Sequence, residues 1–391
     1  MKTTIKDLDI NSKKVIIRVD FNVPIKEGKI VDNTRIVNSL ETIKYALDRA
    51  NKVILLSHLG RIKTPEDKEK NSLELVAVEL GRLLNKEVLF IKDMDFNKIR
   101  ETVNNSKSNL ILLENTRYYD LEGKLESGCD EGLSKEYASL GDIFINDAFG
   151  TIHRAHASNV GIARLLPSGI GFLVEKELKE LEYLDNPERP YLVVMGGSKV
   201  SDKIKVIENI ITKCDKLVIG GAMAFTFLKA KGINTGKSLV EDEYLDFCRE
   251  VLNKYEDKII LPVDTLVSTD IESSSFSNKS INDINNDDIG LDLGYNTINN
   301  IKEIIDLSKT VFWNGPLGYY EKEAYFNATK SLLEYLTTKD IKTILGGGDI
   351  VACATKLNIE DKIYHISTGG GATLEYLEGK ELPGLEIIKN K

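Results

Sequence analysis

Arginine, histidine and asparagine side chains follow short apolar runs in the first half of this sequence. The segments RVDFNVP, SHLGR, ENTR and NDAFGTIHRAH carry most of them, and a further arginine lies in the NTR that comes after the first run. The residues concerned are Asp20, Asn22, Arg35, His58, Arg61, Arg117 and Arg154. A guanidinium group binds phosphate or carboxylate through two parallel hydrogen bonds, which an ammonium group cannot match. If the four arginines converge on one face, they predict a site for a small anion with several charges.

Other interpretations of these residues are open. A single arginine is more often a solvated surface charge in a weak ion pair than a binding group, but the shared position after strands favours binding. His153 and His156 are three residues apart and could be imagined as metal ligands. No cysteine or carboxylate lies at ligand spacing beside them, which favours hydrogen-bonding histidines. His365 lies inside a predicted strand and is expected to be structural.

Glycine-rich turns take the same positions in the second half. They are GGSKVSDK (196–203), GGAMAF (220–225), WNGPLG (313–318), GGGD (346–349) and STGGGA (367–372). Glycine lets the backbone approach a ligand closely, and successive N–H groups can then point at one anion, especially where a helix begins. Five such turns at successive strand ends predict a nucleotide with its phosphates.

The common nucleotide motifs are missing. KGINTGKS (231–238) is similar to a P-loop, but three residues separate its glycines where the motif needs four, and a predicted helix precedes it instead of a strand. No GxGxxG opens a helix after the first strand, which weakens a dinucleotide-binding interpretation.

These residues can act together only if the strands before them end on one edge of a sheet. Apolar runs alternate with polar or glycine-rich turns and with segments of helical periodicity, which is typical of parallel βα units. Their continuous apolar character indicates strands covered on both faces. The predicted strands are 15–19, 53–56, 87–91, 110–113, 143–145, 191–195, 216–219, 259–262, 310–312, 343–345 and 364–366.

The predicted fold class is therefore α/β, with two doubly wound, mostly parallel-sheet, Rossmann-like domains joined by a hinge helix. Residues 73–84 have helical spacing, and Ser72 is placed to cap the start of that helix. A charged amphipathic segment around 175–184 is expected to connect the domains. The Ser- and Asn-rich stretch 268–288 is expected to be a surface loop or an irregular edge hairpin.

Composition limits the classes of function. The 391 residues are enough for two domains, and 42% hydrophobic and 29% charged residues are typical of a globular protein. A net charge of −9 argues against general binding of nucleic acid or of anionic membranes. The cysteines form no CxxC pair, so neither a disulfide framework nor a zinc site is indicated. The start resembles no signal peptide, and no apolar run approaches the ~20 residues of a membrane span, so we expect a cytoplasmic protein.

Taken in order, the segments of both halves resemble the phosphoglycerate kinase family over nearly the whole chain. Beyond those quoted above, the resemblance rests on KLVIGGAMAFTFLKAKG, GKSLVE, FWNGPLGYYE and STGGGATLEYLEGKELPG. It implies a phosphotransferase with a carboxyl group as acceptor. The reaction would be reversible transfer from 1,3-bisphosphoglycerate to ADP, giving 3-phosphoglycerate and ATP in glycolysis.

The resemblance also implies where each substrate binds. Residues 1–170 would bind the triose phosphate with 375–391 packing back on them, 171–190 would form the hinge, and 191–374 would bind the nucleotide. The triose-phosphate site would consist of Asp20, Phe21, Asn22, Arg35, His58, Leu59, Gly60, Arg61, Arg117 and Arg154. The ADP or ATP site would consist of Gly197, Lys199, Lys203, Gly290, Asn314, Pro316, Glu321, Gly347, Gly348, Asp349, Ile350, Thr368, Gly369 and Gly370. Mg²⁺ would be the cofactor with Asp349 as its ligand, and the chain would act as a monomer.

The expected chemistry needs no general base, because the attacking oxygen is already ionised at neutral pH. Positioning and charge stabilisation are then the whole task. By the resemblance, Arg35 and Lys199 would be catalytic and would flank the transferring group from the two domains. Because an acyl phosphate is readily hydrolysed, we expect hinge closure about 171–190 when both substrates are bound.

Several residues depart from the family pattern and leave an alternative open. Ile350 stands where threonine usually follows GGGD, Ala222 stands for a third glycine, and Tyr295 replaces a proline near the expected adenine pocket. Ile62 and Ser198 are further departures that we expect to be tolerated. A non-catalytic relative that binds nucleotide or triose phosphate is thus one alternative, against which the catalytic residues argue. A nicotinamide-dependent oxidoreductase is the other, and only the fold class supports it.

Overall fold

The computed structural model describes residues 1–121 and 123–391, which divide into two compact units. Unit 1 comprises Met1–Lys179 and Glu381–Lys391, and unit 2 comprises Glu180–Lys380. Helix α6 (Phe172–Tyr183) crosses the division, and the C-terminal segment joins unit 1 from Glu381 onward, a few residues later than expected.

Within the described residues, unit 1 is built on a six-stranded parallel sheet with the order β5-β6-β4-β1-β7-β8. Its strands are β1 (Lys14–Val19), β4 (Lys52–Leu56), β5 (Leu89–Ile91), β6 (Leu110–Leu113), β7 (Ile143–Asp147) and β8 (Ser168–Ile170). A small antiparallel pair, β2 (Ile25–Lys26) and β3 (Lys29–Ile30), extends from the loop after β1. Strand β1 lies between β4 and β7, so the order reverses beside it, and ligands of such sheets bind at that point.

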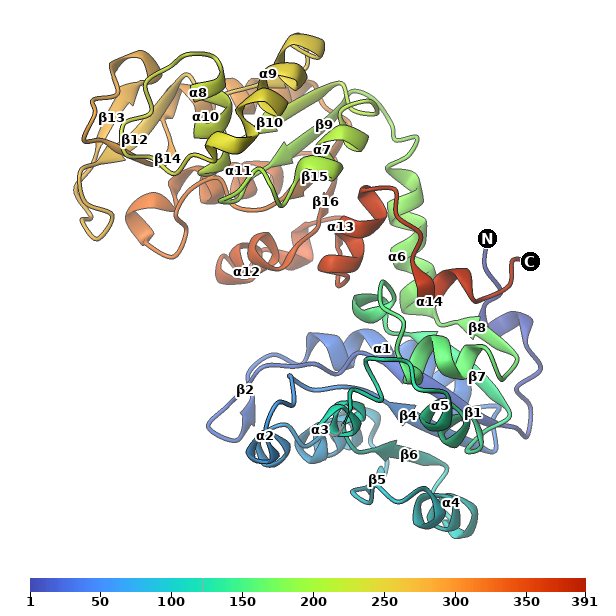
Figure 1. The fold of residues 1–391 in the computed structure, drawn as a ribbon. Coiled ribbons are helices and arrows are strands. Elements are labelled where there is room, and N and C mark those ends of the chain that lie inside the picture. Colours follow the sequence, from blue (N-terminus) through green and yellow to red (C-terminus); the bar gives the residue numbers. More distant parts are fainter. Residues whose placement is uncertain (122) are drawn as a thin grey trace. The chain divides into compact units, whose positions relative to one another are not determined.

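Helices cover both faces of this sheet (Figure 1). The covering helices are α1 (Thr34–Leu47), α3 (Glu74–Leu84), α4 (Phe96–Asn105) and α5 (Glu131–Ala138), and unit 1 also contains α2 (Pro65–Lys70), which buries no residue, and the short C-terminal α14 (Pro383–Glu386). Side chains of a strand alternate between faces. Val15 and Ile17 accordingly pack in one core with Ile43 of α1, whereas Ile16 packs in the other with Ile99 of α4. The continuous apolar runs of the sequence follow from this burial on two sides.

Unit 2 repeats the scheme with a parallel sheet that has six strands in the described part of the chain, in the order β11-β10-β9-β15-β16-β17. They are β9 (Tyr191–Met195), β10 (Lys216–Ile219), β11 (Ile259–Ile260), β15 (Thr310–Asn314), β16 (Lys342–Leu345) and β17 (His365–Ile366). Here the order reverses beside β9. Together with the sheet of unit 1, this confirms the predicted α/β fold class.

The helices of unit 2 pack on its sheet, and a second, antiparallel sheet lies at one end of the unit (Figure 1). The helices are α7 (Ile204–Ile210), α8 (Met223–Ala230), α9 (Leu245–Lys254), α10 (Tyr295–Leu307), α11 (Asn327–Leu336), α12 (Gly348–Lys356) and α13 (Gly371–Leu377). The antiparallel sheet has the order β13-β12-β14, with β12 (Asp264–Ser268), β13 (Ser277–Ser280) and β14 (Ile289–Leu293). The stretch 268–288 thus contains an edge strand, β13, which pairs with the buried strand β12.

Specific hydrogen bonds fix the chain at the ends of unit 1. Asp147, the last residue of β7, accepts hydrogen bonds at Oδ1 from Leu173 N (3.0 Å) and Val174 N (3.3 Å), which hold the first turn of α6. Thr3 N donates to Lys389 O at 2.9 Å, so the two termini lie side by side (Figure 1). No helix among the described residues is long and apolar enough to span a membrane.

Candidate functional site

The first cluster of predicted site residues lies beyond the carboxyl ends of β1 and β4. Asp20 follows β1 directly, and Arg35 in the first turn of α1 donates a hydrogen bond from Nη1 to Asp20 Oδ2. Burial favours a raised pKa for Asp20, but the charge of Arg35 and other cations outweighs it, and the pKa lies below its ordinary value. The side chain of Arg35 is still 37% exposed, so its remaining donors can reach a ligand.

His58 lies in the same cluster as a neutral ring. Burial, assisted by the surrounding arginines, lowers the pKa of His58 to about 3. Its Nδ1 lies 3.3 Å from Nη2 of Arg18. A guanidinium has no acceptor, so Arg18 donates to Nδ1, and the single ring proton of His58 is then on Nε2. The imidazole can therefore donate one hydrogen bond to an anion.

Two hydrogen bonds join the loops that carry these residues. Asn22 Oδ1 accepts from Gly60 N at 2.8 Å, and Ser57 Oγ accepts from Phe21 N at 2.8 Å. The side chains of Phe21 and Leu59 are buried among apolar neighbours. These two residues therefore shape the loops, and their side chains do not face solvent.

The other predicted arginines differ in burial. The backbone N of Arg117 donates a hydrogen bond to Asn115 Oδ1 at 3.1 Å. Burial lowers the pKa of Arg117, and the charge of Arg154 lowers it further. The Nε atom of Arg117 is buried without a hydrogen-bond partner in the described part of the chain. Arg154 is exposed and donates from Nε to Nε2 of His153 at 3.1 Å. Arg61 is also exposed and follows Gly60, but no hydrogen bond or ion pair ties it to the cluster in the described structure.

Sequence reasoning missed the buried network beneath this cluster. Arg18 Nε donates to Ser158 Oγ at 2.9 Å, and Ser158 donates from Oγ to Glu126 Oε1 and from its backbone N to Glu126 Oε2 at 3.1 Å. Arg18 and Glu126 are both fully buried. Buried charged groups of this kind are tolerated only where hydrogen bonds satisfy them, and here Ser158 lies between the two side chains. An arginine inside an apolar strand was the available signal, because a charged side chain there requires a buried partner.

The second cluster surrounds a cavity of about 350 Å³ in unit 2. Its walls include five of the residues expected to hold a nucleotide, namely Gly197, Gly290, Pro316, Glu321 and Asp349. The volume suits a small-molecule ligand. The cavity thus brings together turns that follow β9 and β15 with a residue of β14.

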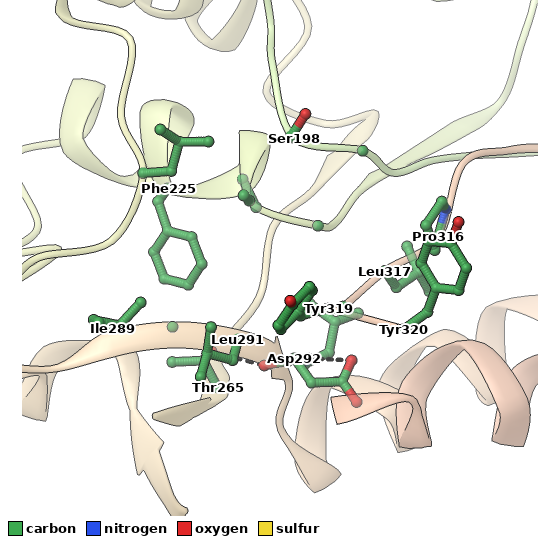
Figure 2. Close-up of a pocket in the computed structure, with 18 of the residues that line it drawn as sticks. Ser198, Phe225, Thr265, Ile289, Leu291, Asp292, Pro316, Leu317, Tyr319 and Tyr320 are labelled. Carbon is green, nitrogen blue, oxygen red and sulfur yellow. Dashed lines mark hydrogen bonds between the residues drawn. The ribbon is translucent and has the colours of Figure 1, made fainter. Parts of the chain in front are cut away.

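One end of the cavity is apolar, as Figure 2 shows. The ring of Phe225 on α8 extends towards Ile289 and Leu291 on β14. Thr265 also lines the cavity, but its Oγ donates to Asp292 O at 2.7 Å and is not free for a ligand. A planar apolar group such as a nucleobase fits such walls better than a charged group does. It was not predicted from the sequence that Phe225, Ile289 and Leu291 line the site, although Phe225 lies in the motif GGAMAF.

A second group of predicted residues is joined through Asn314, the last residue of β15. Lys203 donates from Nζ to Asn314 Oδ1, and Asn314 Nδ2 donates to Gly346 O. Burial lowers the pKa of Lys203, against the attraction of Asp202 and Asp349. Gly347 has a φ of +111°, and a Cβ there would lie 2.4 Å from Asn314 Nδ2. The turn between β16 and α12 can approach Asn314 only because this residue is glycine.

The remaining predicted residues lie around these groups with differing exposure. Lys199 and Gly348 are exposed, and Gly348 begins α12. Ile350 is fully buried in the core of unit 2, so only its backbone could meet a ligand. The segment Thr368–Gly370 leads into α13, which packs against α7, the helix that Lys203 precedes. Tyr295 is an exposed residue at the start of α10 and is not part of the cavity wall.

Asp349 suits the expected metal. It lies in the first turn of α12, its carboxylate is exposed at the cavity, and Tyr320 donates a long hydrogen bond to its Oδ1 (3.4 Å). Among residues 1–121 and 123–391, no three His, Cys, Asp or Glu side chains gather as a metal-binding group. Mg²⁺ is often held by one or two carboxylates together with substrate phosphates. A single carboxylate at a nucleotide cavity therefore fits a metal that enters with the nucleotide.

Known proteins are similar to this chain over most of its length. A family model described as phosphoglycerate kinase matches residues 5–380. The phosphoglycerate kinase of Fusobacterium nucleatum is 53% identical to this chain, with 100% of both chains covered. The solved structure of phosphoglycerate kinase from Coxiella burnetii is 38% identical with a TM-score of 0.88, over 99% of this chain and 98% of that one. The corresponding structure from Pyrococcus horikoshii is 31% identical with a TM-score of 0.83, over 98% of each chain.

The family model spans almost the whole chain, and the solved relatives share its fold from end to end. The motifs on which the resemblance to this family rests are the arginine-containing segments that follow strands in unit 1 and the glycine-rich turns that follow strands in unit 2. This chain belongs to the phosphoglycerate kinase family.

Proposed function

We propose that the two clusters hold the two substrates of one phosphoryl transfer. The reaction of the family is reversible transfer between 1,3-bisphosphoglycerate and ADP, giving 3-phosphoglycerate and ATP in glycolysis, and its acceptor is a carboxyl group. Unit 1 binds the triose phosphate, and unit 2 binds ADP or ATP. The observation that carries the proposal is the placement of the cationic and the glycine-rich residues at the carboxyl ends of two separate parallel sheets.

The triose phosphate would be bound mainly by guanidinium groups. Arg35 and Arg117 have donors that no protein group occupies fully, and Arg61 and Arg154 are exposed at neighbouring loops. His58 adds a neutral donor, and Asn22 keeps the loop of Gly60 in position. Paired donors of this kind suit phosphate and carboxylate, the two ends of 3-phosphoglycerate.

The nucleotide would place its base at the apolar end of the cavity and its phosphates towards the glycine turns. Support comes from Phe225 and Leu291 at one end and from Gly197 and Asp349 at the other. The N–H groups at the start of α12 add partial positive charge for the phosphates. Mg²⁺, carried in with the nucleotide and held by Asp349, would offset the negative charge of the phosphate oxygens during transfer.

The chain's own catalytic task is to position and to stabilise charge. The attacking oxygen is a nucleotide phosphate oxygen, or in reverse a carboxylate oxygen, and it is ionised without help from a base. Arg35 on unit 1 and Lys199 on unit 2 would each contribute a positive charge to the transferring phosphoryl group. Electrostatic stabilisation of this kind usually contributes more than any other single effect to the rate enhancement of such enzymes.

A coupled assay of ATP formation from 1,3-bisphosphoglycerate and ADP tests the proposal. Turnover that requires Mg²⁺ is the expected result. Binding of both substrates without turnover would instead support a non-catalytic relative, the alternative raised by Ile350 and Ala222. The side chain of Ile350 is buried and does not line the cavity. Isoleucine in place of threonine therefore leaves the backbone N–H groups of the turn available to the nucleotide phosphates.

We further propose that the chain works as a monomer in the cytoplasm, as a glycolytic enzyme does. Light scattering that gives the mass of one chain, at concentrations where the assay is run, would support the first part. Cell fractionation with a glycolytic marker tests the second.

A further inference from the structure

One carboxylate from outside the turn holds the segment that carries Lys199. The segment 196–203 connects β9 to α7 and contains no helix or strand. Glu241 Oε2 accepts a hydrogen bond from Ser201 N at 3.0 Å, and Glu241 Oε1 accepts from Ser201 Oγ at 2.6 Å. Ser201 lies two residues after Lys199 and two before Lys203, so Glu241 holds the middle of the segment.

The other contacts of the segment lie on either side of this point. Gly197 N donates to Pro316 O at 3.0 Å, and Lys203 N donates to Val200 O at 2.8 Å. Val200 is fully buried and anchors the backbone next to Lys199. In the part of the chain that the structure describes, Lys199 itself makes no hydrogen bond or ion pair, and it is exposed. The backbone therefore sets where the Lys199 side chain starts and the region that its ammonium group can reach, and Glu241 accepts two hydrogen bonds that hold this backbone.

Glu241 is itself well placed for this role. Its backbone N donates to Thr226 Oγ on α8 at 3.2 Å, and Thr226 is buried. Burial alone would raise the pKa of Glu241, but the hydrogen bonds from Ser201, together with the Val200 backbone and the charge of Lys199, outweigh it, and the pKa lies below its ordinary value. The carboxylate is therefore ionised, and hydrogen bonds to an ionised acceptor are about twice as strong as neutral ones.

We infer that Glu241 is a positioning residue for phosphoryl transfer, which acts through Ser201 on the placement of Lys199. The inference rests on the proposed catalytic role of Lys199. A displacement of a reacting group by about 1 Å lowers rates on the order of a hundredfold. Loss of the Glu241 contacts should therefore slow transfer while leaving the triose-phosphate site of unit 1 unchanged.

The test compares kcat and KM of purified full-length variants. Glu241→Ala is expected to lower kcat about ten- to a hundredfold, with KM for 3-phosphoglycerate within about twofold of wild type. Glu241→Gln keeps an oxygen for Ser201 N and an amide group near Ser201 Oγ, so most of kcat should return. Asp242→Asn is the matched control, because the adjacent Asp242 pairs with Lys229 at 2.7 Å and not with the segment. An equal loss in the control and in Glu241→Ala, or no recovery in Glu241→Gln, would overturn the inference.

A double-mutant cycle separates this inference from the role of Lys199. If Glu241 acts through Lys199, Glu241→Ala should add little to the loss caused by Lys199→Ala. Full additivity of the two losses would overturn the positioning role and keep the role of Lys199. Wild-type kcat in Lys199→Ala would instead remove Lys199 from the mechanism. Should Glu241→Ala fail to fold, Ser201→Ala removes only the Oγ contact and should still give a smaller fall in kcat, whereas unchanged kcat there would contradict the inference.

Discussion

At the scale of single residues, the arginines of unit 1 differ in what holds them, and this difference sets their expected roles. Arg18 is buried and fully engaged with Ser158 and His58, whereas Arg35 has one protein partner and partial exposure. A buried arginine in a network shapes a site, and a partly exposed one with spare donors can bind a substrate.

Arg35→Ala is expected to lower kcat by about 10³-fold, because one positive charge is lost from the transferring group. ADP affinity should stay within about twofold, since ADP is assigned to unit 2. The coupled assay and isothermal titration with ADP measure the two quantities. Arg100→Ala is the control, because Arg100 pairs with Glu136 on the covering helices. A collapse of ADP affinity would show that Arg35 does not belong to the triose-phosphate side.

His58 predicts a pH effect on stability with a definite sign. Its pKa is about 3 in the folded chain and about 6.5 when unfolded, so the unfolded state binds the proton first as pH falls. The contribution of neutral His58 is complete above pH 6.5 and is lost progressively between pH 6.5 and 3. Relative to His58→Asn, the free energy of unfolding of the wild type should fall by about 1.4 kcal/mol between pH 7.5 and 5.5. Urea unfolding at both pH values measures it.

Comparison with His58→Asn matters because other buried groups titrate in the same range. Burial raises the pKa of Asp147 and of Asp292 to about 7, and these carboxyls act on stability in the opposite direction. They are present in both proteins and cancel from the difference. A difference that stays constant with pH would mean that His58 titrates normally, and its NMR ring signal would then shift near pH 6.5.

At the scale of helices and strands, the apolar runs were predicted as strands, whereas several strands that contain polar residues or glycine were missed. Strands such as Leu110–Leu113 and Tyr191–Met195 have the expected bounds because both faces are buried. Strand β8 was missed, since Ser168–Ile170 is short and includes a serine and a glycine. Strand β12 was also missed, because it contains polar residues. It is nevertheless buried, since Asn296 and Thr297 donate hydrogen bonds to the carboxylate of Asp264.

The cap predicted at Ser72 is a further difference between the sequence and the structure. Helix α3 begins at Glu74, and Ser72 Oγ accepts only a 3.3 Å hydrogen bond from Glu74 N. Ser72 instead donates to Glu114, which also accepts from Leu73 N at 2.9 Å. The carboxylate of Glu114, which follows β6, thus accepts a backbone hydrogen bond at the start of α3 in place of the predicted local cap. The Arg18 network escaped prediction for the same reason, since its partners are up to 140 residues apart.

The turn between β16 and α12 predicts a contrast between neighbouring glycines. Gly347→Ala combines a positive φ with a contact of 2.4 Å to Asn314, so it should lower the free energy of unfolding by about 2 kcal/mol or more. Gly348→Ala meets nothing within 4 Å at the start of a helix and should be neutral or slightly stabilising. Urea unfolding of both variants measures the contrast. Equal effects would mean that the turn is not held against Asn314.

At the scale of the whole molecule, the proposed function predicts movement between the units. The triose phosphate and the nucleotide are assigned to different units, and α6 is a continuous helix that passes from one into the other. Its first turn is held by Asp147 of unit 1, and Glu180 pairs with Lys342 of unit 2 at 3.2 Å. Each end is therefore fixed to its own unit, and a change of orientation must be taken up within or beside this helix.

Small-angle scattering should show a decrease in radius of gyration when both substrates are bound. The combination of 3-phosphoglycerate and ADP suits the measurement, because it fills both sites without allowing transfer. Either ligand alone is expected to give a smaller decrease, since only the pair places ligand charges at the clusters of both units. Arg35→Ala with both ligands is the control, and it should close less fully. An unchanged radius of gyration in the doubly bound wild type, with binding verified by titration, would contradict closure and would require the two clusters to react without rearrangement.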